Sequence, residues 1–178
     1  MTEKKTGASL ARHRSKQDIA TPPEFLDAIA RRFGPPAWDL AANSSNSVCG
    51  DGRFFGPGSQ HAEDSLVVPW ARGGSARNGV LFCNPPYGNI SPWAAKCATY
   101  SDRRGWILLL VPASVGATWY ADHVNGKALV LPLRQRIVFV GQSDPYPRDL
   151  LLAAYGFGVN GFQPWSWKDC TSARITAA

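Results

Sequence analysis

The sequence contains few of the residues that build metal centres. Among its 178 residues there are three histidines and four cysteines, and no two cysteines have C-x-x-C spacing. Structural zinc sites are usually built from such closely spaced cysteine or histidine pairs. We therefore expect no bound metal, and we expect the cysteines to be reduced thiols of a cytoplasmic protein; they are Cys49, Cys83, Cys97 and Cys170.

Several familiar catalytic and targeting signals are also missing. The chain has no G-x-G-x-x-G after its first expected strand, no G-x-x-x-x-G-K-[ST] and no apparent Ser-His-Asp set, which disfavours nucleotide hydrolysis and acyl transfer. Its longest apolar block, WILLLVPA, is interrupted by Pro112 and is too short to cross a bilayer. The basic, polar N-terminus has no apolar stretch behind it, so we expect neither a secretory signal nor a membrane partner.

The composition is that of one globular domain with an excess of positive charge. Hydrophobic residues make up 44% of the chain and charged residues 18%, and the formal net charge is +6. This excess is compatible with a polyanionic partner. Part of it lies in residues 3–17, EKKTGASLARHRSKQ, which predicts either a flexible solvated tail or a basic arm that touches phosphates.

Hydrophobic spacing predicts alternating helices and strands. In TPPEFLDAIARRFG we expect Thr21 to be the N-cap of a helix, Glu24 to complete a capping box and Gly34 to end the helix. Apolar strands that do not alternate, separated by helices, predict an α/β fold with a mostly parallel sheet, helices on both faces and an antiparallel edge near the end of the chain. Strands are expected at 36–42, 80–83, 105–113, 127–133, 136–141 and 149–157, and further helices from Ser91 and at 116–124.

Two of the expected strands end on polar residues, Asp39 in AWDLAA and Asn84 in VLFCNPPY. Ligands of α/β sheets bind outside the carboxyl ends of the strands, so we expect the site at this edge. The first of these strands is followed by residues 43–63, a glycine-rich stretch with little periodicity. A loop of this length in a small domain is usually functional or disordered.

Residues Asn84 to Tyr87, called the NPPY segment below, are unusually stiff, because two consecutive prolines fix two φ angles. The side-chain oxygen of Asn84 and the main-chain carbonyl of Pro85 can together accept hydrogen bonds from an exocyclic amino group of a base. Two such acceptors, held at a fixed separation, favour a pyramidal nitrogen whose lone pair can attack. Tyr87 offers a flat face for an unstacked base. The segment therefore predicts chemistry on an amino group.

The chain resembles the phage-type family of DNA N-6-adenine methyltransferases, Dam-like enzymes with an NPPY motif. The resemblance covers residues 18–165 and is carried by several motifs in order, namely TPPEFLDAIARRFG, WDLAA, EDSLVVPW, NPPYGNISPWAAKC, LLLVPASVGATWY and RIVF. It implies a Rossmann-like methyltransferase fold and direct, site-specific methyl transfer from S-adenosylmethionine to N6 of adenine in DNA. It also implies action in a bacterial host cytoplasm if the gene belongs to a phage or prophage.

The resemblance further implies a role for individual residues. The catalytic positions are Asn84, Pro85, Pro86 and Tyr87, and the positions that contact the cofactor are Thr21, Pro22, Asp39, Ala41 and Asp64. Asp39 and Ala41 would lie near the methionine part of the cofactor and Asp64 near its adenosine. From the residues alone, Asp39 could instead cap a turn at the strand end, and Asp64 could be the N-cap of a short helix.

The implied organisation is a basic tail at 1–17, a methyltransferase domain at 18–168 and a C-terminal tail at 169–178. DNA is the expected partner, with no obligatory protein partner evident. Sequence choice would come from the loops at 43–63 and 71–79 or from the tails. Arg134 and Arg136 are candidate phosphate contacts or a solvated pair.

Two features of the sequence depart from the expected family pattern. DLAAN lacks the glycine pair that is common in other methyltransferases, and no arginine lies near Ser114. The NPPY motif also occurs in methyltransferases that act on cytosine N4, on RNA or on protein glutamine, so these substrates stay open. An inactive DNA-binding module with a methyltransferase-like fold is a second alternative. A cytosine-C5 enzyme is disfavoured, because Cys83 precedes Asn84 within a strand and offers no thiolate beside the prolines.

Overall fold

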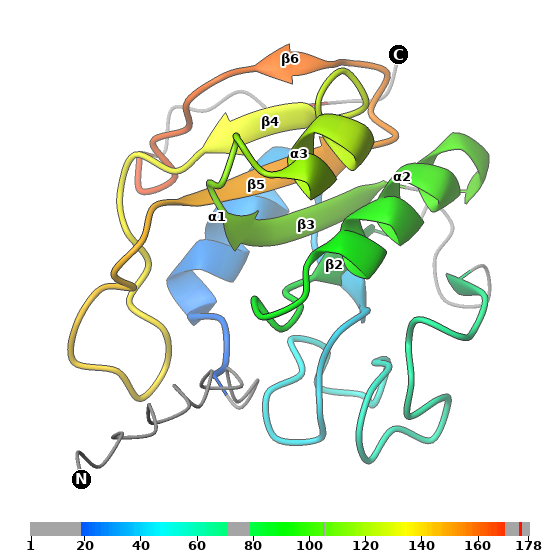
Figure 1. The fold of residues 1–178 in the computed structure, drawn as a ribbon. Helices are drawn as coiled ribbons and strands as arrows, with labels where there is room; N and C mark the ends of the chain where they lie inside the picture. Colours follow the sequence, from blue (N-terminus) through cyan, green and yellow to red (C-terminus); the bar gives the residue numbers. More distant parts are fainter. Residues whose placement is uncertain (1–18, 71–78, 105, 170–174, 176–178) are drawn as a thin grey trace, which may run out of the picture.

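The computed structural model describes residues 19–70, 79–104, 106–169 and 175 (Figure 1). The expected basic tail at 1–17, most of the 71–79 loop, most of the C-terminal tail and Cys170 lie outside the described residues. The fold below is therefore that of the expected methyltransferase domain.

Three helices and six strands make up the described part of the chain. The helices are α1 (Pro23–Phe33), α2 (Ser91–Arg104) and α3 (Thr118–His123). The strands are β1 (Pro36–Asp39), β2 (Val80–Cys83), β3 (Ile107–Pro112), β4 (Leu129–Pro132), β5 (Leu150–Tyr155) and β6 (Gly161–Phe162). They form one sheet in the order β1-β2-β3-β5-β4-β6.

The sheet is mixed and mostly parallel, which confirms the predicted fold class. Strands β1, β2 and β3 pair in parallel, and so do β4 and β6. The reversed strand is β5, which is antiparallel to both β3 and β4. The predicted antiparallel part is thus present, although it lies between β3 and β4 rather than at the rim, and every residue of β5 is buried.

Helices cover both faces of the sheet, as predicted, with α1 behind it and α2 and α3 in front (Figure 1). The side chains of each strand alternate between these two layers. In β2, for example, Phe82 joins the cluster formed with α1, whereas Leu81 and Cys83 join the cluster formed with α2 and α3. Because both faces are buried, the strands read as continuous apolar runs in the sequence.

The start of α1 differs from the prediction. The N-cap is Pro22, no side chain caps the helix, and the capping box expected between Thr21 and Glu24 is wrong. The hydroxyl of Thr21 instead accepts a hydrogen bond from a residue far away in the sequence, described below. The predicted end of the helix is confirmed, since Gly34 adopts a φ of 102° and its N–H bonds to the carbonyl of Ala30.

The strand predicted at 136–141 is also wrong. In this apolar run Ile137 and Phe139 are buried while Val138 and Val140 are exposed, an alternation of burial that a strand would also show. The backbone hydrogen bonds, however, do not form a ladder. The N–H of Val140 bonds to the carbonyl of Ala20, and the carbonyl of Ile137 accepts from Tyr146. Hydrogen bonds therefore connect this segment to Ala20, just before α1, and to Tyr146 in the loop that follows.

Among the described residues, no helix is both long enough and apolar enough to cross a membrane.

Candidate active site

The carboxyl ends of β1 and β2 lie side by side and position the site. Asp39 in β1 is in register with Phe82 in β2, and the N–H of Leu40 bonds to the carbonyl of Phe82 at 2.7 Å. The residues that follow these strands, Leu40 to Ala42 and the NPPY segment, therefore leave the sheet at the same edge. This arrangement brings the two polar strand ends of the sequence together.

The side-chain amide of Asn84 is held on both sides. Its Nδ2 donates to Oγ1 of Thr21 at 3.3 Å, and its Oδ1 accepts from the hydroxyl of Tyr87 at 2.9 Å. Thr21 is only 6% exposed and Asn84 is half-buried. An amide has chemically different ends, so one acceptor and one donor around it define which end faces which way. Three of the predicted site residues are thus in direct contact.

Tyr87 belongs to a small aromatic group at the edge of the site. Its ring meets that of Tyr146 edge-on, with centroids 5.5 Å apart, and Tyr146 meets Phe139 in the same way at 5.9 Å. Burial, together with the neighbouring Tyr146, raises the pKa of the Tyr87 hydroxyl well above its ordinary value. Tyr87 therefore stays protonated at neutral pH and remains a hydrogen-bond donor to Asn84.

Sequence reasoning missed Tyr146. Its signal was its setting in DPYPR, where Pro145 and Pro147 flank an aromatic residue. Two prolines stiffen the chain around Tyr146 as they do before Tyr87.

The predicted site prolines have different surroundings. Pro85 is buried and Pro86 is half-buried. Pro22 is buried, and its carbonyl accepts the first hydrogen bonds of α1, from the N–H groups of Phe25 and Leu26.

Asp39 organises the turn that follows β1. Its side chain is 3% exposed, and its two oxygens accept from the N–H groups of Ala41 at 3.2 Å and Val48 at 3.0 Å. Burial raises its pKa to about 6, although the two peptide hydrogen bonds act in the opposite direction. The turn-capping role considered from the sequence is therefore present in the structure.

Residues 53–56 run beside the Asp39 to Ala42 strand end. The N–H of Ala42 bonds to the carbonyl of Phe55, and the N–H of Phe55 bonds to the carbonyl of Asp39. The two segments approach so closely at Gly56 that a Cβ there would lie 1.8 Å from the carbonyl oxygen of Ala42. The long 43–63 stretch is therefore packed against the site at this point.

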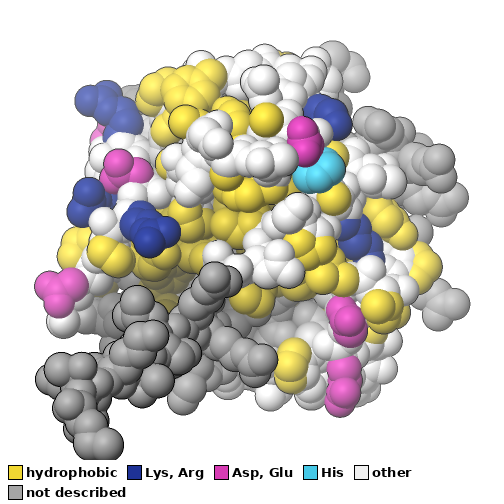
Figure 2. All heavy atoms as spheres, in the orientation of Figure 1, with side chains coloured by type: hydrophobic (Ala, Val, Ile, Leu, Met, Phe, Trp, Pro, Cys, Tyr) yellow, Lys and Arg dark blue, Asp and Glu magenta, His cyan; other side chains and the backbone are white. Residues whose placement is uncertain are grey.

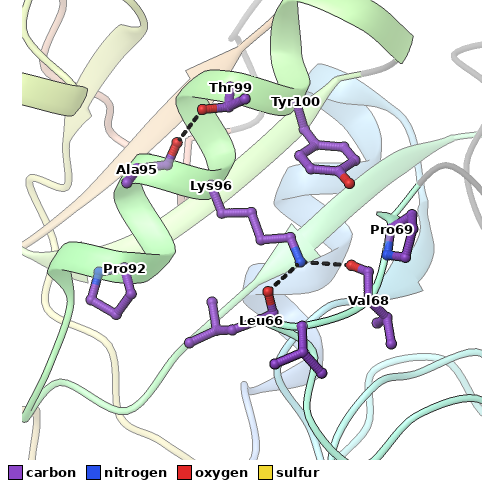
Figure 3. A pocket seen from close by; sticks show the side chains of 9 residues that line it. Leu66, Val68, Pro69, Pro92, Ala95, Lys96, Thr99 and Tyr100 are labelled. Atoms are coloured by element: carbon purple, nitrogen blue, oxygen red, sulfur yellow. Dashed lines mark hydrogen bonds between the residues drawn. The ribbon is translucent and has the colours of Figure 1, made fainter.

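Asp64 is exposed, and its Oδ1 accepts from the N–H of Leu66 at 2.8 Å. The residues after it form a turn, so the short helix considered from the sequence is absent there. Next to this turn is an open cavity of about 520 Å³ (Figure 3). It lies between residues 66–69 and α2, and is lined by Leu66, Val67, Val68, Pro69, Pro92, Ala95, Lys96, Thr99 and Tyr100.

The buried cysteine in front of the NPPY segment is not placed as a nucleophile. Cys83 is 0% exposed, and burial among apolar side chains, with Cys97 as a neighbour, raises the pKa of its thiol well above the ordinary value. Thiolates rather than thiols attack carbon, so Cys83 is inert in this setting. Within the described ranges, no three His, Cys, Asp or Glu side chains gather as metal ligands would.

Basic side chains lie at the carboxyl edge of the sheet, where β1 and β2 also end. Arg134, Arg136 and Arg148 are exposed on the segment between β4 and β5, and Arg136 pairs with Asp149 at 3.2 Å. Figure 2 shows Lys and Arg side chains on the side of the molecule where Figure 1 places this segment, beside an apolar and partly hollowed area.

The NPPY segment follows β2 at the carboxyl edge of a mostly parallel α/β sheet, the place where enzymes of this fold class bind their ligands. The chain matches the family model described as DNA N-6-adenine-methyltransferase (Dam) over residues 9–149, which is more than half of its length. It therefore belongs to the Dam family of DNA N6-adenine methyltransferases, whose members use S-adenosylmethionine as methyl donor. No curated protein and no solved structure matches the chain.

Proposed function

We propose that this protein methylates N6 of adenine at specific sites in DNA by direct transfer, with the NPPY segment as the catalytic element. The observation that carries the proposal is the fixed amide of Asn84, whose Nδ2 is bonded to Thr21 and whose Oδ1 is bonded to Tyr87. A preoriented acceptor costs no reorganisation when the reaction begins, and this is the main source of catalysis in sites of this kind.

In this mechanism the amide oxygen of Asn84 and the carbonyl of Pro85 accept the two N–H groups of the adenine amino group. This draws electron density toward the nitrogen and favours its pyramidal form, so that its lone pair can attack. When bound, S-adenosylmethionine would supply an electrophilic methyl group: the N–C bond would form as the S–C bond breaks, S-adenosylhomocysteine would leave, and N6 would release one proton to water. Pro85 and Pro86 keep the two acceptors at a constant separation, since each fixes one φ angle. Tyr87 supports the extruded base with its ring.

The residues at the end of β1 and in the 64–69 turn suit the binding of the methyl donor, S-adenosylmethionine. Asp39, with its two peptide hydrogen bonds, holds the Leu40 to Ala42 main chain in place beside the NPPY segment. The cavity next to Asp64 has a volume of about 520 Å³ and largely apolar walls, which suits the adenosine part of the donor. We assign the methionine part to Asp39 and Ala41, the adenosine part to Asp64, and further contacts to Thr21 and Pro22.

The basic segment between β4 and β5 is the proposed DNA contact on the described part of the chain. Arg134, Arg136 and Arg148 are exposed there, and the same segment carries Tyr146, which touches Tyr87. Arginines at this place would bind phosphates and orient the duplex without reading its sequence. The net charge of +6 adds a favourable long-range attraction.

The test compares Asn84→Ala with Asn89→Ala, a matched control at an exposed asparagine of the following turn. DNA treated with each variant and labelled S-adenosylmethionine is digested to nucleosides, which are then separated and counted. We expect the wild type and Asn89→Ala to yield N6-methyl-2′-deoxyadenosine, and Asn84→Ala to lose at least about 100-fold in kcat.

Binding of S-adenosylmethionine, measured by calorimetry, should be similar for all three proteins. Undiminished activity of Asn84→Ala would overturn the mechanism. Label in N4-methylcytosine, or label in RNA or protein and none in DNA, would overturn the substrate. A wild-type protein that binds no S-adenosylmethionine would be a DNA-binding module without activity.

A further inference from the structure

The ammonium group of Lys96, in α2, donates all of its hydrogen bonds to one short stretch of main chain. Its Nζ donates to the carbonyls of Ser65 at 2.7 Å, Leu66 at 2.9 Å and Val68 at 2.6 Å. Figure 3 shows the side chain reaching across from the helix, with two of these bonds drawn. An ammonium group has three N–H donors, and all three are engaged here.

Two aromatic rings complete the surroundings of this cation. Nζ lies 4.7 Å from the ring centre of Trp70 and 5.5 Å from that of Tyr100. Such contacts are stronger when the cation is partly removed from water, as it is here. Trp70 is 1% exposed, and its Nε1 donates to the carbonyl and the hydroxyl of Ser65, both at 3.0 Å. Lys96 and Trp70 thus both donate to the carbonyl of Ser65 and hold the same stretch of main chain.

A lysine in this position is costly, and the surroundings compensate for it only in part. Burial lowers the pKa of Lys96, while the nearby carboxylate of Asp64 acts in the opposite direction. A methionine or leucine would fill the same space without this cost. The charged group is therefore needed to bind the three carbonyls, because only a cation with several N–H donors can bond to all of them at once.

The stretch that Lys96 holds is one wall of the cavity described above. Residues 66–69 form that wall, and Pro92, Ala95, Thr99 and Tyr100 of α2 form the opposite one. Residues 65–70 belong to none of the helices and strands of the fold. Helix α2, in contrast, begins four residues after Tyr87 and packs on β3 and α3. Lys96 thus ties a segment without regular structure to a firmly packed element next to the NPPY segment.

We infer that Lys96 is a positioning residue for the methyl donor. It holds residues 65–69 at the distance from α2 that admits the adenosine part of S-adenosylmethionine, and it does not contact that ligand through Nζ. This inference rests on the proposed function, which assigns the adenosine to this cavity and to Asp64. It adds that a side chain outside the NPPY segment determines the affinity for S-adenosylmethionine and does not affect the chemical step.

The experiment replaces the ammonium and keeps the stem, in Lys96→Met. The matched control is Lys127→Met, because Lys127 is exposed and donates to a single carbonyl, that of Asp122, at 2.6 Å. Affinity for S-adenosylmethionine is measured by calorimetry, and kcat and KM are measured separately for S-adenosylmethionine and for DNA. Melting temperatures are recorded for each protein.

For Lys96→Met we expect Kd and KM for S-adenosylmethionine to rise about 10-fold to 100-fold. We expect kcat at saturating donor and KM for DNA to stay within about threefold of the wild type. Lys127→Met should match the wild type in all of these quantities. A general loss of structure would instead change kcat and both KM values together, and that result would overturn the inference.

If Lys96→Met does not fold, Trp70→Phe carries the test. This variant keeps a ring beside Lys96 but loses the two hydrogen bonds to Ser65, and we expect a smaller rise in the Kd for S-adenosylmethionine. Unchanged donor affinity in whichever variant folds overturns the positioning role while leaving the proposed function intact. The proposed function fails separately, if the wild type itself binds no S-adenosylmethionine.

Discussion

Thr21 and Asn84, 63 residues apart in the sequence, meet through a hydrogen bond of 3.3 Å from Nδ2 of Asn84 to Oγ1 of Thr21. The bond joins a residue two positions before α1 to Asn84, the proposed catalytic residue after β2. With the hydroxyl of Tyr87 on the other side, it sets which end of the amide faces Thr21 and which faces Tyr87. A catalytic acceptor needs this definition, because a flipped amide would present N–H groups to the N–H groups of its substrate.

We predict that Thr21→Val lowers kcat about 10-fold and leaves KM for S-adenosylmethionine within about twofold. Valine has nearly the same shape, so the change removes the hydroxyl that accepts this hydrogen bond and weakens the hold on the Asn84 amide, since one such bond contributes about 1 kcal/mol. Thr21→Ser keeps the hydroxyl and should retain most of the activity. Steady-state kinetics with varied donor concentration measure both quantities. If KM for the donor rises while kcat is unchanged, Thr21 acts on the donor and not on Asn84.

The ring and the hydroxyl of Tyr87 have separable roles. Tyr87→Phe keeps the ring and its edge contact with Tyr146 but loses the hydrogen bond to Asn84, so we expect kcat to fall less than about 10-fold. Tyr87→Ala also removes the surface for the base, and stacking is worth about 1–3 kcal/mol per base, so the loss in kcat/KM for DNA should reach about 100-fold. Equal losses in the two variants would contradict a role for the ring in holding the base.

The parts of the site that the sequence could predict are those built by local pattern. Val80 to Cys83 form an uninterrupted apolar run that stops at Asn84, and this pattern correctly indicated a buried strand ending at the carboxyl edge. The two prolines predicted the stiffness of the NPPY segment for an equally local reason. Local patterns fail where a residue has a distant partner.

Thr21 illustrates that failure. A threonine three residues before a glutamate, at the start of a helix, is a reasonable capping box, yet the hydroxyl is bonded to Asn84. The apolar run from Ile137 to Val140 likewise indicated a strand, but the segment bonds to Ala20 and Tyr146 instead of a neighbouring strand. Lys96 gave no signal, since its three acceptors are main-chain carbonyls about 30 residues earlier. In each case tertiary contacts override the local preference.

Gly56 is the position where the 43–63 stretch is least able to accept a side chain. Its φ is +138°, and an added Cβ would lie 1.8 Å from the carbonyl oxygen of Ala42. We predict that Gly56→Ala lowers the free energy of unfolding by at least about 2 kcal/mol, because backbone must move at both segments. Binding of S-adenosylmethionine should weaken as well, since the displaced carbonyl belongs to the β1 edge.

The matched control for Gly56→Ala is Gly50→Ala in the same stretch. Gly50 is exposed, and a Cβ there meets no atom within 4 Å. The free energy of unfolding of Gly50→Ala, measured in urea, should stay within about 0.5 kcal/mol of that of the wild type. A Gly56→Ala protein as stable as Gly50→Ala would show that the approach of residues 53–56 to Ala42 is not required by the fold.

The raised pKa of Asp39 predicts a pH dependence of stability with a definite sign. The pKa is about 6 in the folded protein, whereas an unperturbed aspartate titrates near about 4. Between these values the folded state binds the proton more than the unfolded state does, so the free energy of unfolding falls as the pH rises. This contribution amounts to about 3 kcal/mol at most and is constant above pH of about 7.

Urea unfolding of the wild type and of Asp39→Asn at several pH values between about 4 and 7 isolates this contribution, because the other carboxyl groups cancel in the difference. We expect the stability of the wild type relative to Asp39→Asn to decrease across this window. Asp51 provides a control of opposite sign, since its hydrogen bonds to Arg53 lower its pKa and its contribution is lost as the pH falls. A difference between wild type and Asp39→Asn that is constant with pH would mean that Asp39 has the same pKa in the folded and unfolded states, and it would contradict the prediction.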